Sequence, residues 1–168
     1  ARSSLRSSDS SLSLGAIRVS GRMPGTELDA VLRSRRRWEA IASRVPGIGL
    51  STKGSLMLLR DAEQIAAAEI YVRAMGSTLD LEMIDADAVR ALEPAVSGSF
   101  AGAMHCRDDA WIRPGAAIEA MIHYLETKEA IDVRLGTELV GIEAKGKRLA
   151  VRTSQDGIAA EYVIIAPG

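Results

Sequence analysis

Cysteine is almost absent from this sequence, which excludes several kinds of protein. The 168 residues contain one cysteine, Cys106, so the chain cannot form an internal disulfide. The cysteine and the two histidines do not have the spacing of a zinc site, and we expect no structural metal. A chain without disulfides fits a reducing compartment, and we predict a cytoplasmic protein.

Long apolar runs and an excess of charge of one sign are also missing. No stretch approaches the roughly 18 to 20 consecutive apolar residues of a membrane-spanning helix, and the N-terminal residues lack the apolar core of a signal peptide. With 21 basic and 22 acidic residues, the formal net charge is -1, which gives no general attraction for nucleic acid. We interpret the basic run RSRRR at 33–37 as a solvated helix face. A small molecule is therefore the expected partner.

What the sequence does have is hydrophobic periodicity. Hydrophobic residues make up 47% of the chain, enough for a real core. Residues 1–13 are serine-rich and are predicted to be loop or linker. The spacing of apolar residues predicts helices over 26–44, 61–75, 114–128 and a short one capped by Asp85. Short apolar or alternating runs predict strands at 54–60, 79–84, 99–106, 131–136, 137–145, 147–154 and 158–168.

The order of these elements predicts an α/β chain with an insertion. A helix leads into a strand at 131–136, a small β-meander follows, and the run YVIIAPG at 162–168 is apolar enough to return to a covered sheet. The chain also lacks an initiating methionine, so we expect it to be an internal piece of something longer.

Three blocks of sequence carry a resemblance to a known family. The first is SSDSSLS at 7–13 with the turn LGAIR at 14–18, and the second is FAGAMHCRDDAWIRP at 100–114. The third is TELVGI at 137–142 together with 162–168. In this order they resemble the middle of the FAD-dependent oxidoreductases related to D-amino-acid oxidase, glycine oxidase and sarcosine oxidase. GRMPG at 21–25, followed by a basic helix, resembles a subfamily linked to aminophosphonate use.

The resemblance implies a fold and a cofactor. The implied fold class is α/β, with a Rossmann-like FAD-binding sheet that carries the inserted β-meander and is interleaved with part of an α+β substrate domain. Residues 1–45 and 113–168 would belong to the FAD-binding domain, and residues 46–112 to the substrate domain. The family's phosphate-cradling GxGxxG turn and its carboxylate-clamping residues do not occur here, so we expect these residues alone to bind FAD weakly and to be inactive.

The resemblance also implies which residues lie at the cofactor. Gly15 would let the backbone approach the flavin, Arg18 would stabilise negative charge on its reduced ring, and Leu139 would hold the adenine through its peptide groups. Without the resemblance, an ordinary turn glycine, a surface arginine and a core leucine explain these residues equally well. The full set of predicted cofactor-binding residues is Ser10, Ser11, Leu14, Gly15, Ala16, Arg18, Leu139, Ala166 and Gly168.

The remaining polar residues suggest no catalytic base. His105 and Cys106 are adjacent in a predicted strand, where neighbouring side chains point to opposite faces, so they cannot form a nucleophile and base pair. Asp108 and Asp109 are interpreted as a charged turn before a helix, with a contact to substrate as the alternative.

The function that the resemblance implies is oxidation of the C–N bond of a small amine, an amino acid or an aminophosphonate, by hydride transfer to FAD. Oxidation of a hydroxyl substrate such as glycerol 3-phosphate, or a non-catalytic α/β module, remain alternatives. These residues leave the electron acceptor and the oligomeric state open.

Overall fold

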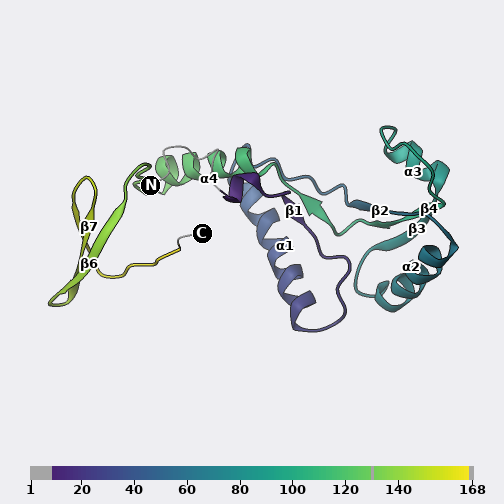
Figure 1. Cartoon of the computed structure of the whole chain (residues 1–168), viewed down its shortest axis with the longest axis horizontal. Helices are drawn as coiled ribbons and strands as arrows, with labels where there is room; N and C mark the ends of the chain where they lie inside the picture. Colours follow the sequence, from purple (N-terminus) through teal and green to yellow (C-terminus); the bar gives the residue numbers. More distant parts are fainter. Residues whose placement is uncertain (1–8, 130, 167–168) are drawn as a thin grey trace. The chain divides into compact units, whose positions relative to one another are not determined.

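The computed structural model describes residues 9–129 and 131–166, which Figure 1 shows as a coloured ribbon. The chain folds as two compact units, one of residues 15–113 and one of residues 1–14 with 114–168. The assignment of segments to a cofactor domain and a substrate domain remains a prediction.

The second and third helices of the 15–113 unit begin where a carboxylate accepts a hydrogen bond from a free backbone amide, whereas the first follows Gly25 and has no side-chain cap. Asp61 precedes the second helix and accepts a hydrogen bond from the Gln64 amide at 2.9 Å. Asp85 precedes the third and accepts from the Ala88 amide at 2.8 Å, which confirms the predicted cap. The helices of this unit are α1 (Thr26–Arg44), α2 (Ala62–Met75) and α3 (Ala86–Leu92).

A three-stranded antiparallel sheet lies between α2 and α3, as Figure 1 shows. Met104 of its central strand packs with Leu59 and Ala68 on the α2 side, whereas the next residue, His105, points to the other face because side chains alternate along a strand. The sheet has the order β2 (Ser55–Leu59), β4 (Gly102–Cys106) and β3 (Leu81–Asp85). These three strands were predicted, with slightly different ends.

A second, very short antiparallel pair was not predicted. β1 (Ala16–Ile17) pairs with β5 (Ala110–Trp111), and Ser51 forms an isolated bridge to Trp111. Strands of two residues are too short to produce an alternating pattern, which is why the sequence does not indicate them.

The core of this unit joins α1 and α2 to the segment after β1. Its members are buried apolar side chains that pack together: Val19, Leu28, Met75, Leu79 and Cys106. Val19 and Met75 are 0% exposed, so the chain after β1 is held against the helices by a fully buried side chain.

The other unit combines a short 3-10 helix, one long helix and a β-meander. The 3-10 helix η2 (Asp9–Leu12) packs against α4 (Pro114–Lys128), so this part of the serine-rich segment is ordered rather than the predicted loop. The predicted meander is confirmed as an antiparallel sheet of β6 (Leu139–Lys145), β7 (Arg148–Thr153) and β8 (Gly157–Ala160).

One predicted strand, at 131–136, and the later part of another, at 158–168, are not formed in the described residues, although the first residues of the latter form β8. Residues 131–134 and 162–166 have no ladder partner there, and Tyr162, Ile164 and Ile165 are 86%, 92% and 64% exposed. A strand exists only with a neighbour to pair with, and strand propensity chiefly reflects fit to a packed, pleated surface. The mixed α/β class with its inserted meander is nevertheless confirmed.

A glycine closes the loop before β2 onto the central strand. Gly54 has a φ of +83°, and a Cβ placed on it would lie 2.5 Å from the Cys106 carbonyl oxygen and 3.0 Å from His105 Nε2. Only a residue without Cβ allows both this backbone conformation and this close approach.

We expect Gly54→Ala to lower the free energy of unfolding by about 3 kcal/mol, because strain at positive φ adds to a backbone clash. Gly98 is the matched control: its φ is +94°, but no heavy atom lies within 4 Å of an added Cβ. Gly98→Ala should therefore cost only about 1 kcal/mol. Urea denaturation of both variants measures the difference, and equal losses would show that the clash at Gly54 is relieved.

Candidate functional site

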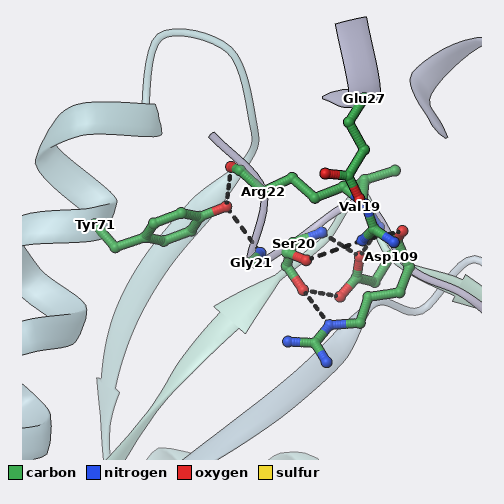
Figure 2. Close-up of polar contacts among 8 residues, drawn as sticks. Val19, Ser20, Gly21, Arg22, Glu27, Tyr71 and Asp109 are labelled. Atoms are coloured by element: carbon green, nitrogen blue, oxygen red, sulfur yellow. Dashed lines mark hydrogen bonds and ion pairs between the residues drawn. The ribbon is translucent and has the colours of Figure 1, made fainter. Parts of the chain in front are cut away.

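A buried carboxylate lies between β4 and β5. Asp109 is 2% exposed, and its oxygens accept four hydrogen bonds. Oδ1 accepts from the backbone amides of Val19 at 2.7 Å and Ser20 at 3.0 Å, as Figure 2 shows. Oδ2 accepts from the hydroxyls of Ser20 and Ser55, both at 2.6 Å. The carboxylate thus joins the chain after β1 to the first residue of β2.

These hydrogen bonds keep Asp109 ionised. Burial raises the pKa of Asp109. The hydrogen bonds from the Ser20 and Ser55 hydroxyls and from the Ser20 and Val19 amides lower it by more, so the pKa of Asp109 lies below its ordinary value of 3.8. At neutral pH this residue is a buried anion held by neutral donors.

Asp108, the preceding residue, has a different role. Its side chain accepts a hydrogen bond from the Asp80 amide at 2.7 Å, and its carbonyl oxygen accepts one from Arg35 Nε at 3.1 Å. Arg35 is only 9% exposed, so it does not belong to the solvated basic face predicted for the run RSRRR. Arg33, Arg36 and Arg37 are exposed, as that interpretation requires.

The predicted flavin-side turn begins at a left-handed glycine. Gly15 has a φ of +74°, and its carbonyl oxygen accepts a hydrogen bond from the Ile112 amide at 2.9 Å. Leu14 is 96% exposed, and Ala16 and Arg18 are exposed as well. The turn therefore has a fixed backbone with side chains that leave it accessible.

A tyrosine holds the end of this segment. Tyr71 on α2 accepts a hydrogen bond from the Gly21 amide at 2.9 Å and donates one to the Arg22 carbonyl oxygen at 3.0 Å, as Figure 2 shows. Arg22 Nε in turn lies 3.0 Å from Glu27 of α1. Residues 19–22 are thus tied to β2, α1 and α2 at once.

The other predicted cofactor residues lie in the second unit. Ser10 is exposed and Ser11 half-buried, both in η2, while Leu139 begins β6 and is 46% exposed. Ala166 is exposed, and Gly168 lies outside the described residues. None of these placements decides whether they contact a cofactor, which remains a prediction.

β6 is irregular at Leu139. The pairing with β7 shifts between Leu139 and Gly141, so Val140 is an extra residue that forms a β-bulge. β6 is also an edge strand, with no partner on its second edge among the described residues. Backbone groups near Leu139 are therefore available to another hydrogen-bonding group, which the predicted adenine contact requires.

A groove lies on the sheet face that α2 does not cover. It has a volume of about 580 Å³, and its lining includes Leu56, Lys53, His105 and Trp111. His105 is 8% exposed, and its Nδ1 lies 3.0 Å from Glu82. The hydrogen bond with His105, followed by one from Arg107, lowers the pKa of Glu82.

Cys106 has no catalytic environment. Its side chain is 1% exposed within the apolar core, and burial raises the pKa of its thiol to about 11. It is a neutral thiol at neutral pH, in agreement with the rejection of a His105 and Cys106 pair.

The described residues contain neither a metal-binding cluster nor a membrane-spanning helix. Within residues 9–129 and 131–166, no group of three or more His, Cys, Asp or Glu side chains is arranged to hold a metal ion. The same part of the chain contains no helix of the length and apolar character needed to cross a membrane.

Comparison with known proteins defines the family. Residues 1–168 match the FAD dependent oxidoreductase (DAO) family, and the chain belongs to it. It is 26% identical over 149 residues to a glycine oxidase from Bacillus licheniformis, covering 86% of this chain and 39% of that protein. The chain thus spans well under half the length of this relative.

Solved structures show the same fold. The crystal structure of glycine oxidase from Bacillus cereus ATCC 14579 is similar with a TM-score of 0.82 and 22% identity, over 99% of this chain and 47% of that one. L-alpha-glycerophosphate oxidase from Mycoplasma pneumoniae with FAD bound has a TM-score of 0.70 and 14% identity, over 92% of this chain and 42% of that one.

The predicted family and its FAD cofactor are therefore confirmed, and the geometry fits this cofactor at two places. The positive φ of Gly15 and the exposure around it allow a flat ring to approach the backbone. The bulged strand β6, which begins at Leu139, has one edge without a strand partner among the described residues. That residues 14–18 and Leu139 contact FAD remains a prediction.

Sequence reasoning missed Asp109, Ser55 and Tyr71 as determinants of this site. Asp109 was interpreted as part of a charged turn, with a contact to substrate as the alternative, and no local pattern distinguishes it from Asp108. The four donors come from residues 19, 20 and 55, which only the folded chain brings to this carboxylate.

We expect Asp109→Asn to lower the free energy of unfolding by about 2 kcal/mol at neutral pH, because an amide cannot accept from all four donors. Because the pKa of Asp109 is lower in the folded than in the unfolded chain, ionised Asp109 stabilises the native state at pH values above the ordinary pKa of an aspartate. This stabilisation is lost as the pH falls through the pKa of Asp109 in the folded chain. The difference between wild type and variant should therefore shrink in acid.

Urea denaturation from pH 7 downward measures this difference, and Asp108→Asn is the control because it removes a half-buried neighbouring carboxylate with one amide donor. Equal destabilisation by both substitutions would contradict the role assigned to Asp109.

Proposed function

We propose that the protein to which this chain belongs is a flavoprotein that oxidises the C–N bond of a small amine, an amino acid or an aminophosphonate. The observation that carries the proposal is the family match over residues 1–168, with glycine oxidase as a relative along 86% of the chain. FAD, when bound, accepts a hydride from the substrate.

The role of this chain in the reaction is to bind and orient. Gly15 and its neighbours Leu14 and Ala16 present backbone to the cofactor, and Arg18 supplies positive charge beside it. In the other unit, Ser10 and Ser11 are proposed to donate to phosphate or ribose oxygens, and Leu139 to hold the adenine through its peptide groups. Ala166 and Gly168 are proposed to pack near the cofactor. No residue of the chain is assigned as a base.

The groove beside His105 supports the binding of a small polar substrate. It combines apolar side chains such as Leu56 with the ammonium of Lys53, the imidazole of His105 and the indole of Trp111. A mostly apolar pocket with a few polar groups is typical of small-molecule sites. The lining also includes Glu93, so Lys53 would attract an acid group of the substrate and Glu93 its ammonium group.

A hydroxyl substrate is the second candidate. The fold similarity to L-alpha-glycerophosphate oxidase favours it, because a closely related backbone there belongs to an oxidase of another substrate class. A cytoplasmic location is part of either proposal and is supported by the single, buried, free thiol of Cys106.

The test uses the purified gene product that carries these residues. We expect flavin absorption bands at about one flavin per chain, and bleaching of these bands when glycine, sarcosine or aminomethylphosphonate is added without oxygen. Glycerol 3-phosphate should leave the bands unchanged. A folded protein without flavin would refute both candidates, and bleaching by glycerol 3-phosphate alone would replace the first by the second.

A further inference from the structure

Arg18, proposed to lie beside the flavin, is connected to the buried carboxylate through one serine. Arg18 Nε donates a hydrogen bond to Ser20 Oγ at 3.2 Å. Ser20 Oγ donates its own hydrogen to Asp109 Oδ2 at 2.6 Å. The guanidinium is therefore the outer member of a chain of hydrogen bonds whose inner member is 2% exposed.

The direction of this chain follows from the chemistry of the hydroxyl. A serine has one hydrogen to donate and two lone pairs that accept. Because the hydrogen of Ser20 is directed to an ionised Asp109, only the lone pairs remain for Arg18, and these suit a cationic donor. The charge of Asp109 thus determines which way Ser20 points and, through it, where Nε of Arg18 is held.

The end of the guanidinium is left free to bind something else. The terminal nitrogens of Arg18 have no hydrogen-bond partner among the described residues, and the side chain is exposed. Gly21, at a φ of +78°, leaves room for the group, because a Cβ there would lie 3.0 Å from Nη2. The result is a cation held through Nε, whose two terminal nitrogens have no hydrogen-bond partner among the described residues.

No cation is paired directly with Asp109 in the part of the chain that the structure describes, since its four partners are amides and hydroxyls. The hydrogen bonds from the Val19 and Ser20 amides to Asp109 would be enough to hold the backbone of this segment. The Ser20 hydroxyl adds a connection to Arg18 that holding the backbone does not require.

We infer that Asp109 is a positioning residue that acts through Ser20 to hold the Arg18 guanidinium toward the negative charge of the reduced flavin. The inference rests on the proposed function for its flavin, but the orientation of Arg18 can be tested without it. Asp109 itself touches neither substrate nor cofactor in this arrangement.

The first test measures solvent exchange of the Arg18 Nε proton by nitrogen-15 NMR in the full gene product. We expect exchange to be roughly tenfold slower than at Arg36, which is exposed on α1, because one charged hydrogen bond protects the proton. Ser20→Ala should abolish the protection. Asp109→Asn should do so as well, since its amide can donate to Ser20 and turn the hydroxyl hydrogen toward Arg18.

Ser43→Ala is the matched control, because it removes a seryl hydroxyl that donates only to the Ala40 carbonyl oxygen on α1. Arg18 exchange at the rate of Arg36 in the wild type, or protection that survives Ser20→Ala, would overturn the inference. The exchange measurement on Ser20→Ala keeps the inference testable if Asp109→Asn does not fold.

The second test measures the midpoint potential of the bound flavin. Arg18→Ala should weaken the preference for reduced over oxidised flavin about tenfold, which equals about 30 mV for a two-electron couple. Ser20→Ala should shift the potential in the same direction, by less, and should add nothing in the Arg18→Ala background. Ser43→Ala should leave it unchanged.

The outcomes separate the two proposals. Equal effects of Ser20→Ala with and without Arg18 would show that the serine does not act through the arginine, and would overturn the inference while the enzyme remains a flavoprotein. A protein with a protected Arg18 Nε proton but no flavin would refute the proposed function and the role of Arg18 at the flavin. Only the hydrogen-bonded chain from Arg18 through Ser20 to Asp109 would then stand.

Discussion

The arrangement of residues 15–113 depends on the buried anion of Asp109. A carboxylate that is removed from water must find donors for its oxygens, and four are supplied by Val19, Ser20 and Ser55. These donors come from segments that are separated by dozens of residues along the chain. Satisfying one side chain therefore brings together the loop after β1, the start of β2 and the end of the central strand.

The same interaction connects the two surfaces that the proposed chemistry uses. The segment held by Asp109 includes Arg18 and continues from Gly15, which is proposed to lie along the flavin. Ser55, its other partner, lines the groove beside His105. A flavoenzyme must keep cofactor and substrate at a constant distance, and a buried carboxylate shared by both surfaces would provide that constraint.

The sheet divides its two faces between packing and binding. On the α2 side, Met104, Leu59 and Ala68 form a buried apolar cluster. On the opposite side, His105, Lys53 and Trp111 line an open groove. Period-two alternation along β4 produces this division, and Gly54, which also lines the groove, lets the loop before β2 approach Cys106 and His105.

The sequence by itself determined most of the elements and the family. Helical periodicity gave the bounds of α1 and α4 as they are found, and local capping chemistry identified Asp85, because these signals lie within a few residues of one another. It also located the meander, whose turns and alternation are local. It failed at 162–166, where an apolar run has the composition of a strand but no neighbour to pair with in the described residues.

Only the tertiary structure decided the role of the polar residues. Asp108 and Asp109 are adjacent and chemically identical, yet one is half-buried with an amide donor to its carboxylate and the other is a buried anion with four. Arg35 is buried while its neighbours in the same basic run are exposed. Such differences depend on which distant segments reach a side chain, and that information is absent from the local sequence.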